Sequence, residues 1–145
     1  MSITTAMCTS FKGELLGGTH DLDTHTLKLA LIKASPSGTY GAATTNYSDV
    51  TGNSDESSGT NYSAGGQNLD GATISTTGTT AIVDFTDEVF SNVTTSASGC
   101  IIYNSSASNK AICVIDFGGT VSATAGDLTI EFPAADASNA VIRIA

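Results

Sequence analysis

A chain of 145 residues is long enough for one domain with one hydrophobic core, and we predict a single domain over residues 1–145. Charged residues make up only 13% of it, and Thr, Ser, Gly and Asn replace them, which favours short strands joined by tight turns. The formal net charge is −9 with five Lys and Arg in all, which excludes nucleic acid as an expected partner and argues against anionic membrane surfaces, because both need clustered basic side chains.

Residues 3–16 are the one segment that the sequence predicts to be helical. Met7, Phe11 and Leu15 follow one another at intervals of four residues and would lie on one helix face, and Gly17-Gly18 would end the helix. A helix of this length is marginal alone, so we expect it to pack on its own sheet or on a neighbouring subunit. No basic stretch followed by an apolar run is visible at the N-terminus, so we expect synthesis in a cytoplasm.

A short polar segment follows the predicted helix and contains both histidines of the chain. His20, Asp21, Asp23 and His25 form a His-Asp-x-Asp-x-His string whose spacing would suit a metal ion. No motif elsewhere supplies a matching third ligand. We therefore interpret the string as a polar connection between the helix and the first strand, and we predict no metal or other cofactor.

Residues 26–33 form the first predicted strand, because Leu27, Leu29 and Leu31 alternate with other residues and would share one face. The next stretch, about residues 35–66, is rich in Ser, Thr, Gly and Asn and has few apolar side chains. A segment this long without predicted structure often marks an interaction loop in a compact domain. We therefore treat this long polar loop as a candidate interface element, together with the helix.

From residue 67 onward, strand signals recur at short intervals between turn residues. The expected features are strands at 69–75, 79–85, 98–103, 110–117, 127–132 and 140–144, an irregular piece at 89–93, a hairpin loop at 104–109 and a turn at Gly118-Gly119. About eight short strands with frequent turns, after one short N-terminal helix, predict an all-β fold, an antiparallel sandwich or jelly roll.

The three cysteines cannot all pair within one chain. Cys100 and Cys113 lie in apolar, strand-like runs, where a free cysteine behaves as a small hydrophobic residue. We expect free, buried thiols, with a disulfide between Cys100 and Cys113 as the alternative.

The acidic pairs Asp55-Glu56 and Asp87-Glu88 come nearest to the paired carboxylates of a glycosidase. A sugar-binding cleft normally offers aromatic platforms, yet Trp is absent and aromatic residues total 6%. The sequence also lacks the Gly-x-Ser-x-Gly elbow of a hydrolase. We interpret these acids as loop residues, and we predict no catalytic residues and no enzyme activity.

Several blocks of the sequence resemble a family of small virion proteins of tailed bacteriophages, described as structural or head decoration proteins. The blocks are residues 9–18 (TSFKGELLGG), 27–31 (LKLAL), 62–66 (YSAGG), 83–85 (VDF), 102–104 (IYN), 114–119 (VIDFGG) and 132–145 (FPAADASNAVIRIA). Residues 49–60 match least.

The resemblance implies a capsid cement protein that binds the major capsid protein on the outer surface of the head. It also implies a homo-oligomer, dimer or trimer, located in the virion after synthesis in the host cytoplasm. The resemblance carries no catalytic residue and fixes no contact residue. From the helix and the polar loop we expect the interface to include Met7, Phe11, Leu15, Tyr40, Tyr47 and Tyr62.

Two other functions remain open on the sequence. One is a tail- or fibre-associated host-binding module that recognises surface carbohydrate, for which four tyrosines are the available aromatic platforms besides Phe. The other is a secreted enzyme or lectin with calcium near Asp21 and Asp23.

Overall fold

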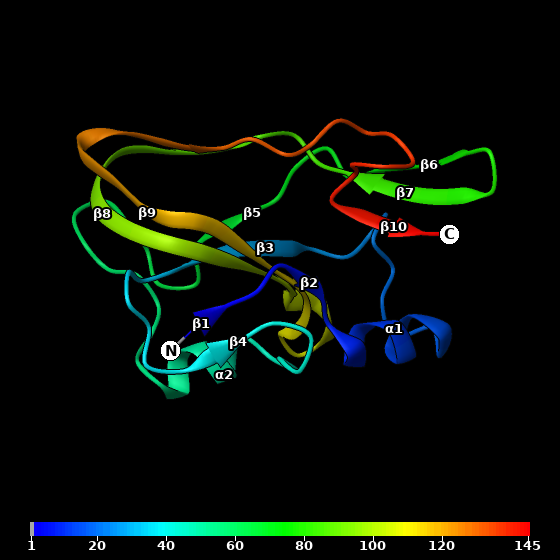
Figure 1. Cartoon of the computed structure of the whole chain (residues 1–145), viewed down its shortest axis with the longest axis horizontal. Helices are drawn as coiled ribbons and strands as arrows, with labels where there is room; N and C mark the ends of the chain where they lie inside the picture. The colour runs from blue at the N-terminus through cyan, green and yellow to red at the C-terminus, as the bar shows by residue number, and fades with distance from the viewer. Residues whose placement is uncertain (1) are drawn as a thin grey trace.

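The computed structural model describes residues 2–145 and is built mostly of β-strands (Figure 1). The strands are β1 (Ser2–Ile3), β2 (Ala6–Met7), β3 (Leu27–Ile32), β4 (Thr39–Tyr40), β5 (Gln67–Asn68), β6 (Thr73–Thr77), β7 (Thr80–Asp84), β8 (Glu88–Asn104), β9 (Lys110–Ile130) and β10 (Ile142–Ile144). The helices are α1 (Thr9–Leu16), α2 (Ser48–Gly52) and the single 3-10 turn η1 (Ser105–Ala107). None of the helices within residues 2–145 is long and apolar enough to cross a membrane.

A five-stranded sheet in the order β2-β9-β8-β3-β5 is the frame of the molecule. Its two long strands, β8 and β9, form an antiparallel hairpin that pairs from Asn104 and Lys110 at the η1 turn to Glu88 and Ile130 at the far end. Strand β3 pairs antiparallel with the part of β8 nearest the turn. Strands β1, β2 and β3 and helix α1 all contact this hairpin directly.

The β8–β9 hairpin bends back over the rest of the sheet (Figure 1). Gly99 pairs with Asp116 and the next pair is Ala97 with Val121, so residues 117–120 of β9 stand against a single residue of β8. Extra residues on one strand bend that strand and increase its twist. The far half of the hairpin therefore lies above the half near η1, and apolar side chains fill the space between them.

Two smaller sheets complete the fold. Strands β6 and β7 form a hairpin around Gly78, whose φ of 60° favours glycine, and β10 pairs antiparallel with the other side of β7. Strands β1 and β4 pair in parallel at the opposite end of the molecule. The three-stranded sheet β10-β7-β6 lies beside α1 (Figure 1), and this arrangement forms one wall of the candidate surface described below.

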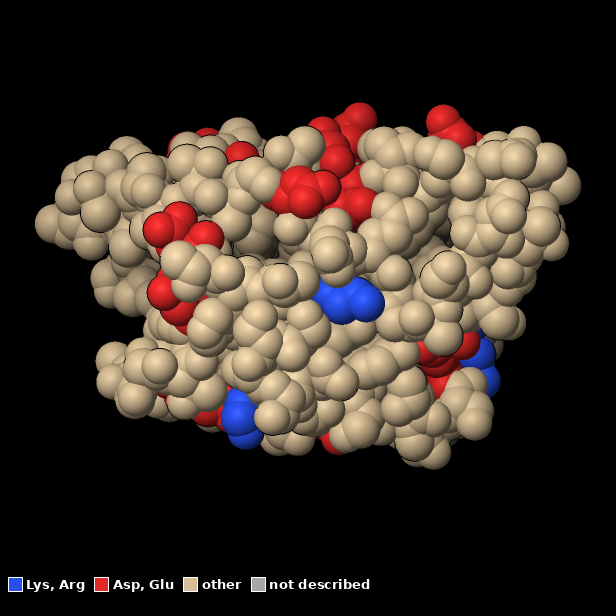
Figure 2. All heavy atoms as spheres, turned by 180° about the vertical axis from the view of Figure 1, so that it is seen from behind, with Lys and Arg blue, Asp and Glu red and all other residues tan. Residues whose placement is uncertain are grey.

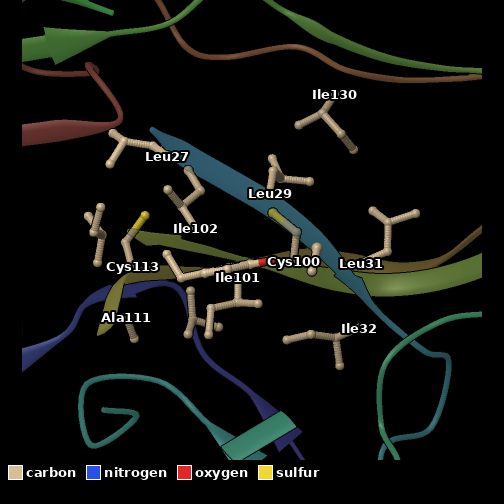
Figure 3. Close-up of a cluster of buried hydrophobic side chains, with 14 of the residues drawn as sticks. Leu27, Leu29, Leu31, Ile32, Cys100, Ile101, Ile102, Ala111, Cys113 and Ile130 are labelled. Carbon is tan, nitrogen blue, oxygen red and sulfur yellow. The ribbon is translucent and has the colours of Figure 1, made fainter. Parts of the chain in front are cut away.

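The core extends over both faces of strand β3. Figure 3 shows Leu27, Leu29 and Leu31 on one face and Ile32 on the other, and none of the four is more than 2% exposed. The first face is covered by the returning half of the hairpin, which contributes Ile130. Burial on both faces explains why β3 is almost wholly apolar.

Several predictions from the sequence are confirmed. The fold is mostly β with antiparallel sheets, and α1 is its one helix longer than five residues. The predicted strands at 26–33 and 79–85 are observed as β3 and β7, and the loop at 104–109 joins β8 to β9 as a hairpin.

The predicted helix at 3–16 starts too early. Residues 2–7 instead form β1 and β2, and α1 begins at Thr9. Met7 pairs with Cys113, and the amide of Cys8 donates a 2.9 Å hydrogen bond to the carbonyl of Ile112. Pairing with the edge of β9 satisfies the backbone of this segment, and it outweighs the helical spacing of the apolar residues.

The predicted turn at Gly118-Gly119 is a bend within one strand. The expected strand at 110–117 is part of β9, and that at 127–132 overlaps its end, which falls at Ile130, while 98–103 and the irregular piece at 89–93 are parts of β8. Turn residues interrupt the pairing there without ending it, because the partner strand continues past the bulge.

The long polar loop, residues 35–66, is folded against the sheet. It contains β4 and α2, and isolated bridges join Glu56 to Ile32 and Thr60 to Thr94. Its composition suggested a structureless excursion, but its polar side chains satisfy its own backbone, as described next.

Candidate interaction surface

Asp55 is the centre of a buried polar network that holds the start of the polar loop. Its side chain is fully buried and accepts hydrogen bonds from the Ser37 amide (2.9 Å), the Gly38 amide (2.8 Å) and the Tyr40 hydroxyl (2.6 Å). Lys33 Nζ lies 3.1 Å from its Oδ1. Burial alone raises the pKa of Asp55, but these hydrogen bonds and the lysine together hold the pKa below its usual range. The carboxylate is therefore a structural anion.

Glu56 forms a second network at the end of the loop. Its carboxylate accepts hydrogen bonds from the hydroxyls of Tyr47 and Tyr62 and from the amide of Gly65 (2.6 Å). Tyr47 stacks on Tyr103 with ring centroids 4.4 Å apart, and the Tyr103 hydroxyl donates to the Gly65 carbonyl. Burial, with the neighbouring carboxylate, raises the pKa of both Tyr47 and Tyr62. These groups stay neutral hydrogen-bond donors.

The two histidines both contact Asn104, a fully buried residue at the end of β8. Asn104 Nδ2 donates to Nδ1 of His20 (3.0 Å) and to Nδ1 of His25 (2.9 Å). Because Nδ1 of His20 accepts, its Nε2 carries the proton and donates to Glu14 at 3.0 Å. The His-Asp-x-Asp-x-His string thus connects α1 to the start of β3, and residues 2–145 contain no group of three or more His, Cys, Asp or Glu that could hold a metal ion.

An apolar cleft of about 400 Å³ opens between α1 and the three-stranded sheet. Ile74, Val83 and Ile142 are paired across β6, β7 and β10 and so share one face of that sheet. The cleft between this face and the helix is lined by Leu15, His20, Asp21, Leu22, Ile74, Ala81, Ile82, Val83, Ile142 and Ile144. We call this the α1–β6 cleft.

The rim of the α1–β6 cleft exposes large apolar side chains. Ile74 is 52% exposed and Ile144 is 46% exposed, and both line the cleft. Leu16, which follows Leu15 in α1 but does not itself line the cleft, is 90% exposed. Single exposed apolar residues are ordinary, but a cluster around a concave apolar site is typical of a surface that binds another protein.

Elsewhere on the surface most side chains are uncharged, and the charged ones are mostly acidic. Figure 2 shows the face opposite to that of Figure 1, where acidic side chains gather along the upper part and basic side chains are few. Three of the five basic residues have acidic partners or neighbours within the chain: Lys33 with Asp55, Lys110 with Glu14, and Arg143 near Asp136. The surface as a whole therefore favours a partner with positive charge.

The six residues predicted for the interface lie in different environments. Phe11 and Tyr40 are in the core, 0% and 2% exposed, so the single chain presents neither of them to a partner. Tyr47 and Tyr62 are half-buried and bind Glu56. Leu15 lines the α1–β6 cleft, and Met7 lines a separate groove beside β9.

Sequence reasoning missed Leu16, Ile74 and Ile144. The helical spacing of Met7, Phe11 and Leu15 places Leu16 outside the apolar face. A large apolar side chain at a position expected to face solvent is unusual, and this is the signal that could have singled out Leu16. Ile74 and Ile144 belong to strands whose partners only the tertiary structure defines.

Comparison with protein-family models, with curated proteins and with solved structures found no match for this chain.

Proposed function

We propose that this protein is a structural virion protein, not an enzyme, that binds the outer surface of a tailed-phage capsid and bridges major capsid subunits. In this proposal the two halves of the bent hairpin, with the smaller sheets, form a β-sandwich that presents the α1–β6 cleft to the shell. The exposed apolar rim of that cleft is the observation that carries the proposal. The resemblance to phage head proteins supplies the identity of the partner.

The charge of the chain is consistent with such a role. A net charge of −9 keeps free copies soluble and apart, and it favours docking on a basic surface. A shell under internal pressure gains strength from many copies that each bridge neighbouring subunits, even when a single contact is weak. Association of copies as a dimer or trimer on the shell is part of the proposal.

The tyrosines favour this role over that of a carbohydrate-binding module. The hydroxyl of Tyr40 binds Asp55, that of Tyr62 binds Glu56, and that of Tyr103 binds the Gly65 carbonyl. Tyr40 and Tyr103 are each 2% exposed, and the half-buried Tyr62 stacks on the buried Phe90, so these rings are not available as platforms for a sugar.

Purified protein added to phage heads that lack it tests the proposal. We expect saturable binding, seen by sedimentation and as added density in electron micrographs of the heads. Ile74→Lys and Ile144→Lys should each weaken binding by about tenfold or more, because each places a charge in the apolar rim. Val89→Lys is the matched control, since Val89 is 38% exposed and does not line the cleft.

Heads that take up no protein would refute the proposal. Binding that Ile74→Lys and Ile144→Lys leave unchanged would refute the assignment of the cleft. Light scattering of the free and head-released protein then measures the number of copies in each oligomer.

A further inference from the structure

Strand β9 has an open edge along its far half. Its inner edge pairs with β8, whereas on its outer edge only β2 pairs with it, at Cys113 and Val114. The amide of Asp116 donates to the Thr5 side chain, and beyond that residue no strand among residues 2–145 pairs with the outer edge. Residues 121–123 and 128–130 therefore present backbone groups to a chain that can pair with them, whereas the amides of Gly118 and Ala125 bind side chains of the protein itself.

This edge lacks two of the usual forms of protection. Natural proteins commonly block an open edge with lysine or proline, and residues 117–130 contain neither. The bulge at residues 117–120 bends the edge, and its pairing with β8 is irregular again at residues 124–127, where Ala125 has a φ of 47°. Residues 121–123 and 128–130 pair regularly with β8 on the inner side. These two stretches, free of lysine and proline, are suited to strand addition.

An apolar groove of about 910 Å³ runs beside the open edge. Its floor includes Met7, Ile115, Phe117, Phe132 and Val141, all of which are only partly buried. These side chains pack against the core on one side and face the groove on the other. A chain added to β9 would place alternate side chains into this groove and complete their burial.

The charges along the edge select the chemistry of the added chain. Asp116, Asp127 and Glu131 are exposed, and residues 116–131 contain no Lys or Arg. Arg143 also lines the groove, but it donates to the Ala137 carbonyl and lies near Asp136. A second copy of this chain, which carries a net charge of −9, would meet repulsion here, whereas a basic segment would meet attraction.

We propose that the outer edge of β9 and its groove bind an extended segment of a partner protein in which apolar residues alternate with Lys or Arg. The segment adds a strand to β9, places its apolar side chains in the groove and its basic side chains beside Asp127 and Glu131. Only the source of the segment, a major capsid subunit, rests on the proposed function. The binding itself does not.

A synthetic peptide of about ten residues that alternates Val and Lys is the probe, since about ten residues span most of the open edge. Binding to the purified protein is measured by fluorescence anisotropy at low and high salt. We expect saturable binding that weakens with salt, and at least about tenfold weaker binding of a peptide that alternates Val and Glu.

Val121 supplies the matched pair of variants. Val121 lines the groove and is 39% exposed, while Val89, on the neighbouring strand, is 38% exposed and lies outside the groove. We expect Val121→Lys to weaken binding of the Val-Lys peptide by about tenfold and Val89→Lys to leave it unchanged. Glu131→Gln should reduce the salt dependence of peptide binding. Asp23→Asn, which removes a charge at an exposed position between α1 and β3 and outside the groove, should leave it unchanged.

Three outcomes would overturn the proposal. The first is equal affinity for the two peptides, and the second is an equal loss of affinity in Val121→Lys and Val89→Lys. The third is absence of peptide binding together with self-association that Val121→Lys abolishes. That result would identify a second copy of the chain as the occupant of the groove. Peptide binding by a protein that does not bind heads would support this inference and refute the proposed function, so the two can fail separately.

Discussion

The hydroxyl of Tyr40 donates a 2.6 Å hydrogen bond to Oδ2 of Asp55, and both residues are almost completely buried. Both lie in the polar stretch 35–66, which by composition looks like an unstructured loop. The bond joins β4 to the segment that follows α2, and Asp55 also binds the amides of Ser37 and Gly38. A single carboxylate thus joins residues 37–40 to residue 55 and orders the first part of the stretch.

The first prediction concerns the contribution of Asp55 to stability. Asp55→Asn keeps the shape of the side chain but removes its charge, so it weakens the bonds from Tyr40 and the two amides. It also removes the ion-pair partner of Lys33, whose remaining bond is to the Ser54 carbonyl. We expect a loss of about 2–3 kcal/mol in the free energy of unfolding, measured by urea denaturation. Asp23→Asn, at an exposed position, is the control and should change it by less than about 0.5 kcal/mol. Equal effects of the two substitutions would contradict a structural role for Asp55.

The second prediction is the pH dependence of the difference in unfolding free energy between the wild type and Asp55→Asn. The pKa of Asp55 is lower in the folded protein than in the unfolded chain, so the folded state binds fewer protons. Its contribution to stability is complete above the unfolded pKa of about 3.9 and is lost as the pH falls from there toward the folded pKa. The difference in unfolding free energy between wild type and Asp55→Asn should be constant from pH ~7 to ~5 and shrink below pH ~4. A difference that grows in acid would show the opposite sign of the pKa shift.

The strands that could be predicted from the sequence are those whose pattern is local. Leu27, Leu29 and Leu31 alternate, and β3 appears where they do; the turn residues at 104–109 do join two paired strands. The class of fold follows from the same signals. The lengths of the strands could not be predicted in this way. Gly118 and Gly119 are typical turn residues, yet β9 continues through them because β8 pairs with it on both sides of the bulge.

The candidate site was less predictable than the fold. Phe11 and Leu15 do share a helix face, but the first is buried and only the second reaches the α1–β6 cleft. The cleft exists because β10, near residue 142, pairs with β7 beside a helix formed by residues 9–16. Contacts between segments so distant in the chain leave no periodic signal in either of them.

The third prediction tests the close packing of the polar loop on β3. A Cβ atom at Gly66 would lie 1.8 Å from the carbonyl oxygen of Leu29, and Gly66 has a φ of 76°. Gly66→Ala should therefore lower the free energy of unfolding by about 3 kcal/mol or more, through both the clash and the strained backbone. Gly13 in α1 is the matched control, since a Cβ there meets no atom within 4 Å.

Gly13→Ala should raise stability by about 0.5–1 kcal/mol because alanine favours the helix. The opposite signs of the two Gly→Ala changes, measured as shifts in the midpoint of urea unfolding, are the test. Tolerance of alanine at Gly66 would mean that the loop does not contact β3 as described.

The fourth prediction is the reactivity of the three cysteines, all of which are free and buried. Burial, with the charges of Asp49 and Glu14, raises the pKa of Cys8 to about 12, and burial raises that of Cys100 to about 12. Because the thiolate is the reactive form, the folded protein at pH ~8 should react with a thiol reagent only at the rate at which it unfolds.

Ser91→Cys, at an exposed position of β8, is the positive control and should add one fast-reacting thiol. In urea without reductant, all three native cysteines should react. If only one cysteine reacted there, Cys100 and Cys113 would be joined as a disulfide, which would contradict the free thiols of this structure.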